Sequence, residues 1–457
     1  EFKCRLSEYI DTAYWTNDHE FNLARKSMIF NKEDSPIFRE LLFEVLPRYR
    51  VSRESFNDIL SSIGFTQDVP REKLELVKEF LNCFDPIKYN SLFDHQVDSI
   101  FTTYKERQNI VVTTGTGSGK SYCFMIPIIL NLLSESIGNA GRTKWSGKSL
   151  RDDYNWWNDQ SLNFVPKRQT TNRTPAIRAL LMYPLNALVQ DQVDELRSIL
   201  NSPSAENYYQ QALNGERIFF GQYSGTTLGT GSAVRDKLLD CQRELLKIDE
   251  LSTKFVSKDG DDGVIQKTDG SELLTRWDMQ EFPPDILITN YSMLSIMLIR
   301  DFEASMFQQT KQWLSENENN TFYLVLDELH SYRGTGGTEI SYIVKTLLHK
   351  LGLAPGHKQL RIISTSASLD DVKLERNSDP EFLRDFFGIP AGKHTFKVIH
   401  GNQIQYKNGY IKEIGKLEKL FESFEEKHAE KHFLSTFLAQ LQSALNMKTS
   451  NLGKILN

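Results

Sequence analysis

The stretch TTGTGSGKS, residues 113–121, decides the fold of this chain. An apolar run, residues 109–112, leads into it, and a helical pattern, residues 122–133, follows it. A strand, a glycine-rich turn and a Lys-Ser pair that opens a helix form the context of a phosphate-binding loop. A fortuitous glycine-rich turn is the alternative interpretation, but the strand before it and the helix after it favour a nucleotide site.

The loop also indicates how a nucleoside triphosphate would be held. Glycines let the backbone approach the phosphates, and consecutive N–H groups at the start of a helix form a site for anions. We expect Lys120 to reach the β- and γ-phosphates of ATP and the Ser121 hydroxyl to bind Mg²⁺. Thr114 departs from the usual pattern, which has glycine or alanine at this position. The residues expected to contact ATP are Gln96, Thr114, Gly115, Thr116, Gly117, Ser118, Gly119, Lys120 and Ser121.

Gln96 lies on an expected helix just upstream of the first core strand. A glutamine amide can read the edge of an adenine through two hydrogen bonds. An aromatic residue such as Phe84, Tyr89 or Phe93 could stack on the same ring. When Gln96 is considered alone, a surface glutamine on a helix is an equally good interpretation.

Strands alternate with helices from residue 91 to residue 390, with two interruptions. This alternation predicts an α/β fold in which helices cover both faces of a parallel sheet. Residues 1–90 show helical spacing broken by proline and glycine, which predicts a helical accessory region. We expect residues 134–175 and 232–282 to be insertions, and residues 391–457 to form a mixed and helical segment.

Polar sequences follow the expected strands at their carboxyl ends, where open α/β sheets bind ligands. They are YPLNALVQDQ (183–192), TNYSML (289–294), DELH (327–330) and STSAS (364–368). We expect Asp327 to hold Mg²⁺ and Glu328 to orient or deprotonate the attacking water, which distinguishes a hydrolase from a kinase. His330 and Ser366 could couple the γ-phosphate to the sheet through hydrogen bonds, although His330 could equally be a capping residue.

The first insertion and its flank are basic. Residues 141–180 hold eight Lys or Arg and three Asp, a net charge of +5. The basic residues are Arg142, Lys144, Lys148, Arg151, Lys167, Arg168, Arg173 and Arg178. With Trp145, Trp156 and Trp157 interleaved, the segment could grip a phosphate backbone and stack on exposed bases. A solvated loop with a small aromatic cluster is the alternative, and commoner, explanation.

The bulk composition is that of an ordinary globular protein, with 39% hydrophobic and 25% charged residues. The net charge of −6 gives no overall basic field for nucleic acid, so any contact must come from a local surface. The four cysteines form no Cys-x-x-Cys pair, which argues against zinc and disulfides and for a reducing, cytoplasmic location. The longest apolar stretch, residues 123–133, is too short to span a bilayer, and no membrane association is expected.

Together, Gln96, the phosphate-binding loop and the four strand-end sequences resemble the superfamily 2 DEAD/DEAH-box helicases. The resemblance covers residues of about 92–390 and implies the first RecA-like domain of such an enzyme. The sequences DELHSYRG (327–334) and TNYSML (289–294) are similar to those of the MrfA-like branch and of helicases in the DISARM and Druantia phage-defence systems.

The resemblance also implies roles for individual residues. It assigns Lys120 and Ser121 to ATP–Mg²⁺, Asp327 and Glu328 to Mg²⁺ and water, and Gln96 to adenine. Residues implied to couple the state of the γ-phosphate to the rest of the sheet are His330, Ser366, Ala367 and Ser368. Those implied to lie along one nucleic-acid strand, with DNA favoured over RNA, are Pro184, Asn186, Gly225, Thr289 and Asn290.

Two departures qualify this resemblance. The family usually has Ser-Ala-Thr where this chain has Ser-Ala-Ser at 366–368, which keeps a hydroxyl. Nothing after residue 368 resembles a second RecA-like lobe with its arginine finger, a group that accelerates hydrolysis by roughly 10³–10⁵. We therefore expect that a longer chain or a partner protein supplies that lobe.

The expected function is an ATP-dependent helicase or translocase on nucleic acid, and a chain with one lobe should hydrolyse ATP weakly. The alternative is a binding or scaffold module that ATP gates without unwinding. A small-molecule kinase is disfavoured, because Glu328 and the strand-end motifs have no role there.

Overall fold

The structure is a computed structural model, and it describes most of the chain. The described residues are 2–13, 16, 18–30, 48–115, 117–138, 141–145, 147–148, 150–169, 173–184, 186–259, 265–332, 334–366, 381–389 and 396–404. The chain divides into two compact units, Glu1–Pro47 and Arg48–Asn457.

The first unit contains a pair of helices, α1 (Phe2–Ala13) and α2 (His19–Phe30). Charged side chains connect the two helices, because Arg25 and Lys26 of α2 both pair with Asp11 of α1. The Lys26 Nζ to Asp11 Oδ2 distance is 3.2 Å.

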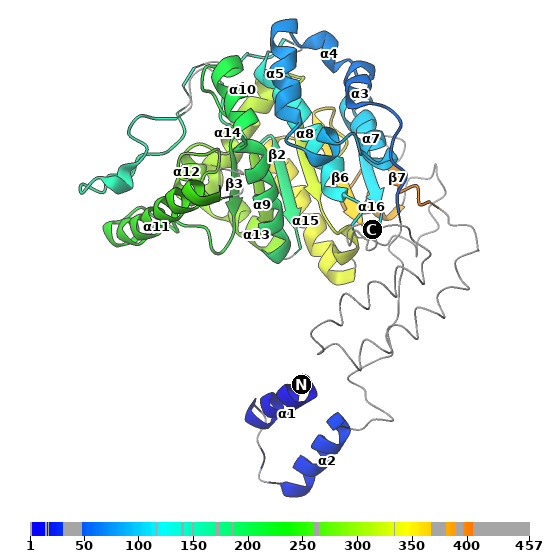
Figure 1. The fold of residues 1–457 in the computed structure, drawn as a ribbon, viewed down its shortest axis with the longest axis vertical. Helices are drawn as coiled ribbons and strands as arrows, with labels where there is room; N and C mark the ends of the chain where they lie inside the picture. Colours follow the sequence, from blue (N-terminus) through cyan, green and yellow to red (C-terminus); the bar gives the residue numbers. More distant parts are fainter. Residues whose placement is uncertain are drawn as a thin grey trace. The chain divides into compact units, whose positions relative to one another are not determined.

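The second unit is built on a seven-stranded sheet (Figure 1). Its strands are β1 (Asn109–Thr113), β2 (Ala179–Tyr183), β3 (Phe220–Tyr223), β4 (Ile286–Asn290), β5 (Phe322–Leu326), β6 (Leu360–Ser366) and β7 (Phe396–His400). Their order is β3-β4-β2-β5-β6-β1-β7, and every neighbouring pair is parallel. The predicted parallel sheet is confirmed.

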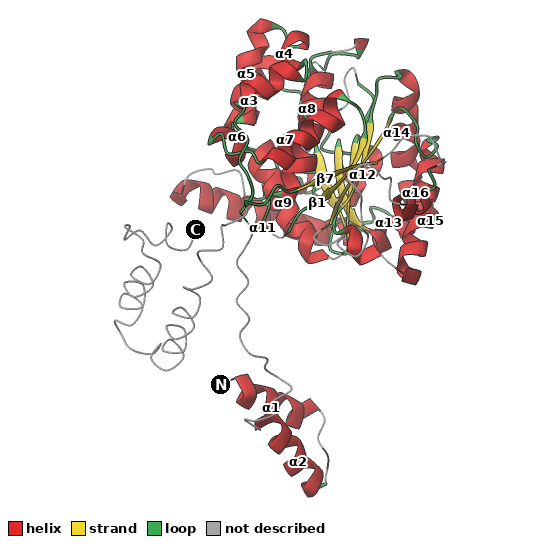
Figure 2. Ribbon diagram, turned by 90° about the vertical axis from the view of Figure 1, so that its right-hand side faces the viewer, coloured by secondary structure: helices red, strands yellow, loops and turns green. Residues whose placement is uncertain are grey.

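Helices cover both faces of this sheet, as predicted (Figure 2). The helices on one face are α3 (Phe56–Ser62), α4 (Phe65–Asp68), α5 (Arg71–Leu81), α6 (Asp85–Lys88), α7 (Asp94–Ile100), α8 (Lys120–Ser136), α9 (Asn186–Leu200) and α10 (Pro203–Leu213). Those on the other are α13 (Tyr291–Ile299), α14 (Ala304–Glu316), α15 (Gly334–Leu351) and α16 (Glu381–Phe387). Successive strand residues alternate between the two cores: Val112 packs in the first, Val111 in the second. This double burial explains why the strands are continuously apolar.

Residues 48–90 belong to the same compact unit as the sheet. The ring of Phe80 on α5 lies 5.6 Å from the ring of Tyr208 on α10. Near the start of this segment, Val51 forms a β-bridge with Phe93, and Tyr49 forms one with Gln403. The helices expected to form an accessory region therefore pack directly on the core around the sheet from residue 48 onward.

The two insertions pack against each other and form a small core of their own. The second insertion contributes α11 (Arg235–Asp259) and α12 (Arg276–Glu281). Their apolar side chains meet the tryptophans of the first insertion in a cluster of Trp156, Trp157, Leu162, Leu238, Cys241, Leu245, Leu274 and Trp277. The Trp157 indole N–H also donates to Asp249 Oδ2 at 2.9 Å. The two segments are thus one structural addition at the β3 edge of the sheet.

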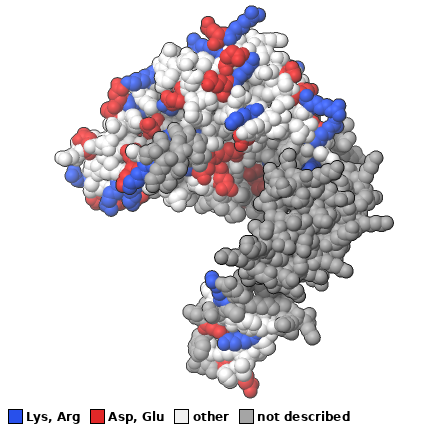
Figure 3. Space-filling model, viewed as in Figure 1, with Lys and Arg blue, Asp and Glu red and all other residues white. Residues whose placement is uncertain are grey.

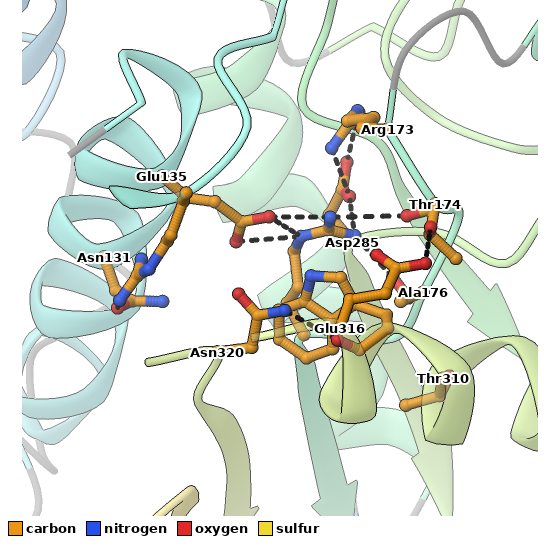
Figure 4. A network of polar contacts seen from close by, with 12 residues as sticks. Asn131, Glu135, Arg173, Thr174, Ala176, Asp285, Thr310, Glu316 and Asn320 are labelled. Carbon is orange, nitrogen blue, oxygen red and sulfur yellow. Dashed lines mark hydrogen bonds and ion pairs between the residues drawn. The ribbon is translucent and has the colours of Figure 1, made fainter. Parts of the chain in front are cut away.

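Four of the eight basic residues around the first insertion are buried: Lys167, Arg168, Arg173 and Arg178. Three of them surround the fully buried Asp285, with Arg173 Nη1 at 2.8 Å and Arg178 Nη1 at 3.0 Å from its Oδ1. In Figure 4, Arg173 and Asp285 point toward each other, and Glu135 reaches the same cluster of charges from α8. Burial alone would raise the pKa of Asp285, but the three guanidinium groups hold that pKa below its usual range.

The hypothesis that this segment grips nucleic acid is therefore wrong for these residues. Trp145 is buried as well, and the Arg173 guanidinium lies 3.4 Å from the centre of its ring. The arginines form ion pairs inside the protein, with carboxylate partners that lie far away in the sequence. On the described part of the face shown in Figure 3, Lys and Arg are scattered among Asp and Glu.

No membrane-spanning segment was expected from the sequence. None of the described helices combines the length with the apolar composition that crossing a bilayer requires.

Candidate nucleotide site

The phosphate-binding loop and the acidic pair reach the same edge of the sheet. β6 lies between β1 and β5, and Thr113 at the end of β1 pairs with Ser366 of β6. Leu326, which precedes the acidic pair, pairs with Ser364 of the same strand. Since neighbouring strands are about 4.8 Å apart, the two motifs begin about 10 Å from each other. Side chains can close that gap.

The loop has the backbone conformation that an anion site needs. Gly117 and Gly119 have φ angles of +77° and +68°, in the region that side chains disfavour. Gly119 is followed directly by Lys120, the first residue of α8. The N–H groups at the start of this 17-residue helix lie beside the loop. Thr116 lies outside the described residues.

The unusual Thr114 is used inside the loop. Its hydroxyl lies 2.6 Å from the hydroxyl of Ser118, and both side chains are buried. Its backbone N–H donates to the carbonyl of Ser366 at the end of β6. The departure from glycine or alanine therefore adds a hydrogen bond across the loop.

Lys120 is paired with the acidic residue expected to act on water. Its Nζ lies 3.2 Å from Glu328 Oε1, and the two side chains are 11% and 21% exposed. The two residues are 208 positions apart in the sequence. The pair brings together the cation expected at the γ-phosphate and the carboxylate expected beside the attacking water.

Asp327 is held in place at the end of β5. Its N–H donates to the Met182 carbonyl of β2 at 3.1 Å, and its carboxylate accepts a hydrogen bond from the Thr365 hydroxyl of β6. Burial raises the pKa of this carboxyl, and the neighbouring Glu328 raises it further. Thr365 and Lys120 offset part of that shift. A desolvated carboxylate of this kind gains most from a bound cation.

Glu328 has a strained backbone, with a φ angle of +52°. Residues other than glycine avoid this region, and strain of this kind gathers at functional sites. Its second carboxylate oxygen, Oε2, lies 3.2 Å from His330 Nδ1. His330 Nδ1 is in turn 3.4 Å from the Ser366 hydroxyl. The acidic pair is thus connected to the end of β6, where Ala367 and Ser368 lie outside the described residues.

The donor set fits a magnesium ion. A hydroxyl at Ser121 and a carboxylate at Asp327 are oxygen ligands of the type that Mg²⁺ prefers. Among the described residues, three buried polar atoms close to this pair have no hydrogen-bond partner: Tyr183 Oη, Gln192 Oε1 and Tyr332 Oη. Burial raises the pKa of both tyrosines, and the charge of Asp327 raises it further. Unpaired polar atoms of this kind are the ones that hydrated metal and phosphate groups would satisfy.

Gln96 contacts the loop backbone. It is 1% exposed, its Nε2 donates to the Gly119 carbonyl at 3.0 Å, and its Oε1 accepts from the Phe93 N–H at 2.8 Å. Next to it, His95 Nε2 lies 3.0 Å from the Ser118 carbonyl. In this structure Gln96 braces the phosphate loop, and the surface-glutamine interpretation is wrong.

Besides His95, sequence reasoning missed Tyr49 and Gln192, which also touch the loop. The Gly115 N–H donates to the hydroxyl of Tyr49 at 2.7 Å, and nothing in the sequence around Tyr49 marks it. Gln192 Nε2 donates to the Ser121 hydroxyl at 3.1 Å. Gln192 is the last residue of the YPLNALVQDQ stretch, and its place in that motif indicated a functional position. The sequence did not predict that it would contact Ser121.

The residues expected along a nucleic-acid strand lie at or just after the carboxyl ends of the adjacent strands β3, β4 and β2. Gly225 is exposed, and a side chain there would meet nothing within 4 Å. Asn290 caps α13 by accepting from the Met293 N–H at 2.7 Å. Thr289 is fully buried, and its hydroxyl donates to the Tyr223 carbonyl. The prediction that the Thr289 side chain contacts nucleic acid is therefore wrong. Its hydroxyl instead helps to hold β3 and β4 together.

Pro184 follows β2 directly and is partly exposed, while the side chain of Asn186 is outside the described set. The other polar strand ends thus share one edge with the phosphate loop.

Residues 93–247 match the DEAD/DEAH box helicase family. This part of the chain is similar to a DEAD/DEAH box helicase domain.

Relatives of this chain include a Druantia protein and ATP-dependent helicases. Druantia protein DruE of Escherichia coli (strain UMEA 4076-1) is 29% identical over 449 residues, which cover 87% of this chain and 22% of that protein. The uncharacterized ATP-dependent helicase YprA of Bacillus subtilis (strain 168) is 23% identical, covering 73% of this chain and 31% of YprA. This chain therefore spans between about a fifth and a third of the length of these relatives.

An uncharacterized ATP-dependent helicase of Methanocaldococcus jannaschii is 25% identical over 334 residues, covering 72% of this chain and 34% of that one. A solved structure of the helicase MrfA bound to DNA aligns at 17% identity with a TM-score of 0.41. That alignment covers 88% of this chain and 41% of MrfA.

Proposed function

We propose that this chain is the ATP-binding lobe of a helicase or translocase that moves on nucleic acid. The observation that carries the proposal is the 3.2 Å contact between Lys120 and Glu328 at the edge where β1 and β5 end. It places a cation for phosphate and a base for water within one site. The DEAD/DEAH box match over residues 93–247 supports the same assignment.

The residues of the site have distinct roles in this proposal. The amides of residues 117–119 and the Lys120 ammonium hold the phosphates, while Gln96 and Tyr49 keep the loop in shape. Ser121 and Asp327 would hold Mg²⁺, which would supply positive charge to neutralise the phosphates. When ATP enters, Lys120 exchanges Glu328 for a phosphate, and the freed carboxylate can accept a proton from water.

Coupling to nucleic acid runs through β6 in this proposal. His330 lies between Glu328 and Ser366, and the Ser366 carbonyl accepts from the Thr114 N–H. A change at the γ-phosphate can therefore alter the contacts of Glu328 at one end of this series and of Thr114 at the other. Pro184, Asn186, Gly225 and Asn290 follow strands on the far half of the same edge and would lie along one strand of nucleic acid.

We also propose the wider setting of this lobe. A second RecA-like lobe, from a longer chain or from a partner, would complete the site and supply an arginine finger. Residues 91–390 form the ATPase domain, with residues 1–90 and 391–457 as flanking segments. DNA is proposed over RNA, and the cytoplasm is proposed as the location.

Nucleic-acid-stimulated ATP hydrolysis tests this function. It should be measured with the second lobe present, with single-stranded DNA, double-stranded DNA and RNA as activators. We expect stimulation by at least one of them, with DNA the best, and loss of stimulated turnover in Lys120→Ala. Stimulated turnover that survives Lys120→Ala would refute the site. Tight nucleic-acid binding that depends on ATP, but without turnover, would instead establish the gated scaffold.

A further inference from the structure

A cavity of about 350 Å³ lies between α9, the end of β3 and the second insertion. It is lined by Gln190 of α9, Gln222 of β3, Thr226 and Thr227 of the loop after β3, and Gln266 of the insertion. Leu228, Leu273 and Ile248 add aliphatic walls. The volume is within the range of small-molecule sites, and the lining mixes neutral polar groups with apolar surface.

The polar groups of this cavity have unused capacity. Gln190 Nε2 donates to Asp194, Gln222 Nε2 to Ser224, and Gln266 Nε2 to Glu272. Among the described residues, none donates to the Oε1 atom of any of these three glutamines. Each amide can therefore accept one hydrogen bond and donate a second, which is the pattern that a nucleobase edge presents.

The charges of the cavity disfavour a phosphate. Its lining includes the carboxylates of Glu244 and Glu272 and one cation, Arg197. That cation is already committed, because Arg197 Nε and Nη2 bond both oxygens of Glu272 at 2.7 and 2.9 Å. A neutral, flat, hydrogen-bonding group fits such a lining, while an anion does not.

The cavity adjoins the edge where a nucleic-acid strand is proposed to lie. Gly225, which precedes the lining residue Thr226, has an ordinary φ angle and open space where a side chain would be. The fold therefore places no demand for glycine there, which points to close approach by a ligand backbone. The second insertion holds this loop, because Arg276 Nη2 donates to the Ser224 carbonyl and the Arg276 N–H to the Leu228 carbonyl.

We propose that this cavity takes an unstacked nucleobase of the bound strand, with adenine fitting the glutamine amides best. The inference rests on the proposed function, because it needs a strand that passes Gly225. It also gives the second insertion a role, since the insertion closes one side of a base pocket and makes binding depend on bases as well as phosphates. Reading splayed bases by their hydrogen-bonding edges is how proteins recognise single strands.

The affinity of the full 457-residue chain for two labelled 12-mers tests this pocket. The probes are oligo-dA and an abasic strand with the same phosphates, measured by fluorescence anisotropy. We expect oligo-dA to bind about tenfold or more tightly than the abasic strand. Gln190→Leu and Gln266→Leu should each reduce that ratio severalfold, without changing the affinity for the abasic strand. Gln312→Leu, an exposed position on α14, is the matched control and should change neither affinity.

Each outcome separates the two proposals. Equal affinity for the two strands, or variants that weaken both strands equally, would overturn the base pocket and leave the proposed function standing. Failure of both strands to bind would overturn the pocket and the nucleic-acid role together. Gln190 is exposed, so its replacement should fold normally, and thermal unfolding of each variant checks this.

Discussion

Lys120 and Glu328 meet at 3.2 Å, although 208 residues separate them. Each side chain neutralises the charge of the other, and the two would have to separate before Lys120 could bind a phosphate of the nucleotide. The ion pair keeps both charges satisfied in a partly buried site, where an unpaired charge would be costly. Replacement of this contact by a phosphate is the step on which the proposed function depends.

The first prediction concerns Glu328→Gln. We expect ATP hydrolysis to fall by about 10²–10³, because the amide cannot accept a proton from water. Nucleotide affinity should stay the same or increase, because Lys120 is no longer held by a carboxylate. Phosphate release and equilibrium binding of a fluorescent ATP analogue measure the two effects. Glu339→Gln, at an exposed position of α15, serves as the control, and a loss of binding in Glu328→Gln would contradict this role.

The second prediction concerns Gln192, whose amide donates to the Ser121 hydroxyl. Gln192→Leu removes this hydrogen bond and should raise the Mg²⁺ concentration needed for half-maximal nucleotide binding by about tenfold, as loss of contacts to metal ligands commonly does. Binding without Mg²⁺ should change little. A titration of Mg²⁺ at fixed nucleotide gives the result, with Gln312→Leu as control. An unchanged midpoint would show that Gln192 does not support the metal site.

The third prediction concerns the buried charges around Asp285. Asp285→Asn leaves Arg168, Arg173 and Arg178 without their shared carboxylate, so we expect a loss of about 3–5 kcal/mol of stability. Denaturant unfolding measures it. Asp240→Asn breaks an exposed pair with Arg243 and should change stability by less than about 0.5 kcal/mol. Similar small effects in the two variants would show that the Asp285 cluster is not needed for folding.

The fourth prediction is a pH dependence from Glu195 of α9. Burial raises the pKa of this carboxyl to about 7, although a hydrogen bond with Tyr122 opposes the shift. The folded protein therefore binds this proton more tightly than the unfolded chain. The contribution of Glu195 to the free energy of unfolding falls as pH rises toward 7 and is smallest above pH 7. Glu195→Gln should be more stable than the wild type at pH 8 by about 1–3 kcal/mol, with little difference at about pH 4.5.

Thermal or denaturant unfolding at both pH values measures the difference. The comparison with the wild type removes the contribution of the other carboxylates, since they are common to both proteins. If Glu195→Gln is less stable at pH 8, the ionised carboxylate must be stabilised by a partner, and burial does not control its charge.

The sequence was sufficient for the parts of the site that lie within short motifs. The loop at 113–121 and the DELH tetrad each carry strand, turn and chemistry within about ten residues, so their place at strand ends followed from local pattern. The parallel sheet followed from the alternation of strands and helices. The neighbours of each strand did not, because apolar pattern identifies strands without stating their order.

Long-range partners could not be predicted from the sequence. Arg178 belongs to a basic stretch, and only the fold reveals that Glu135 and Asp285 neutralise it inside the protein. Tyr49 contacts Gly115 from 66 positions away and has no motif around it. The same holds for the packing of the two insertions, which looked like independent loops and instead share one apolar cluster.

The central claim is that a triphosphate binds at the loop that carries Lys120. Isothermal titration calorimetry of ATP with Mg²⁺ into this chain and into Lys120→Ala tests it most directly, with Lys247→Ala on the exposed face of α11 as the control. We predict binding by the wild type and the control, and a loss of at least about tenfold in affinity in Lys120→Ala. Equal affinity in all three proteins would place the nucleotide elsewhere and contradict the claim.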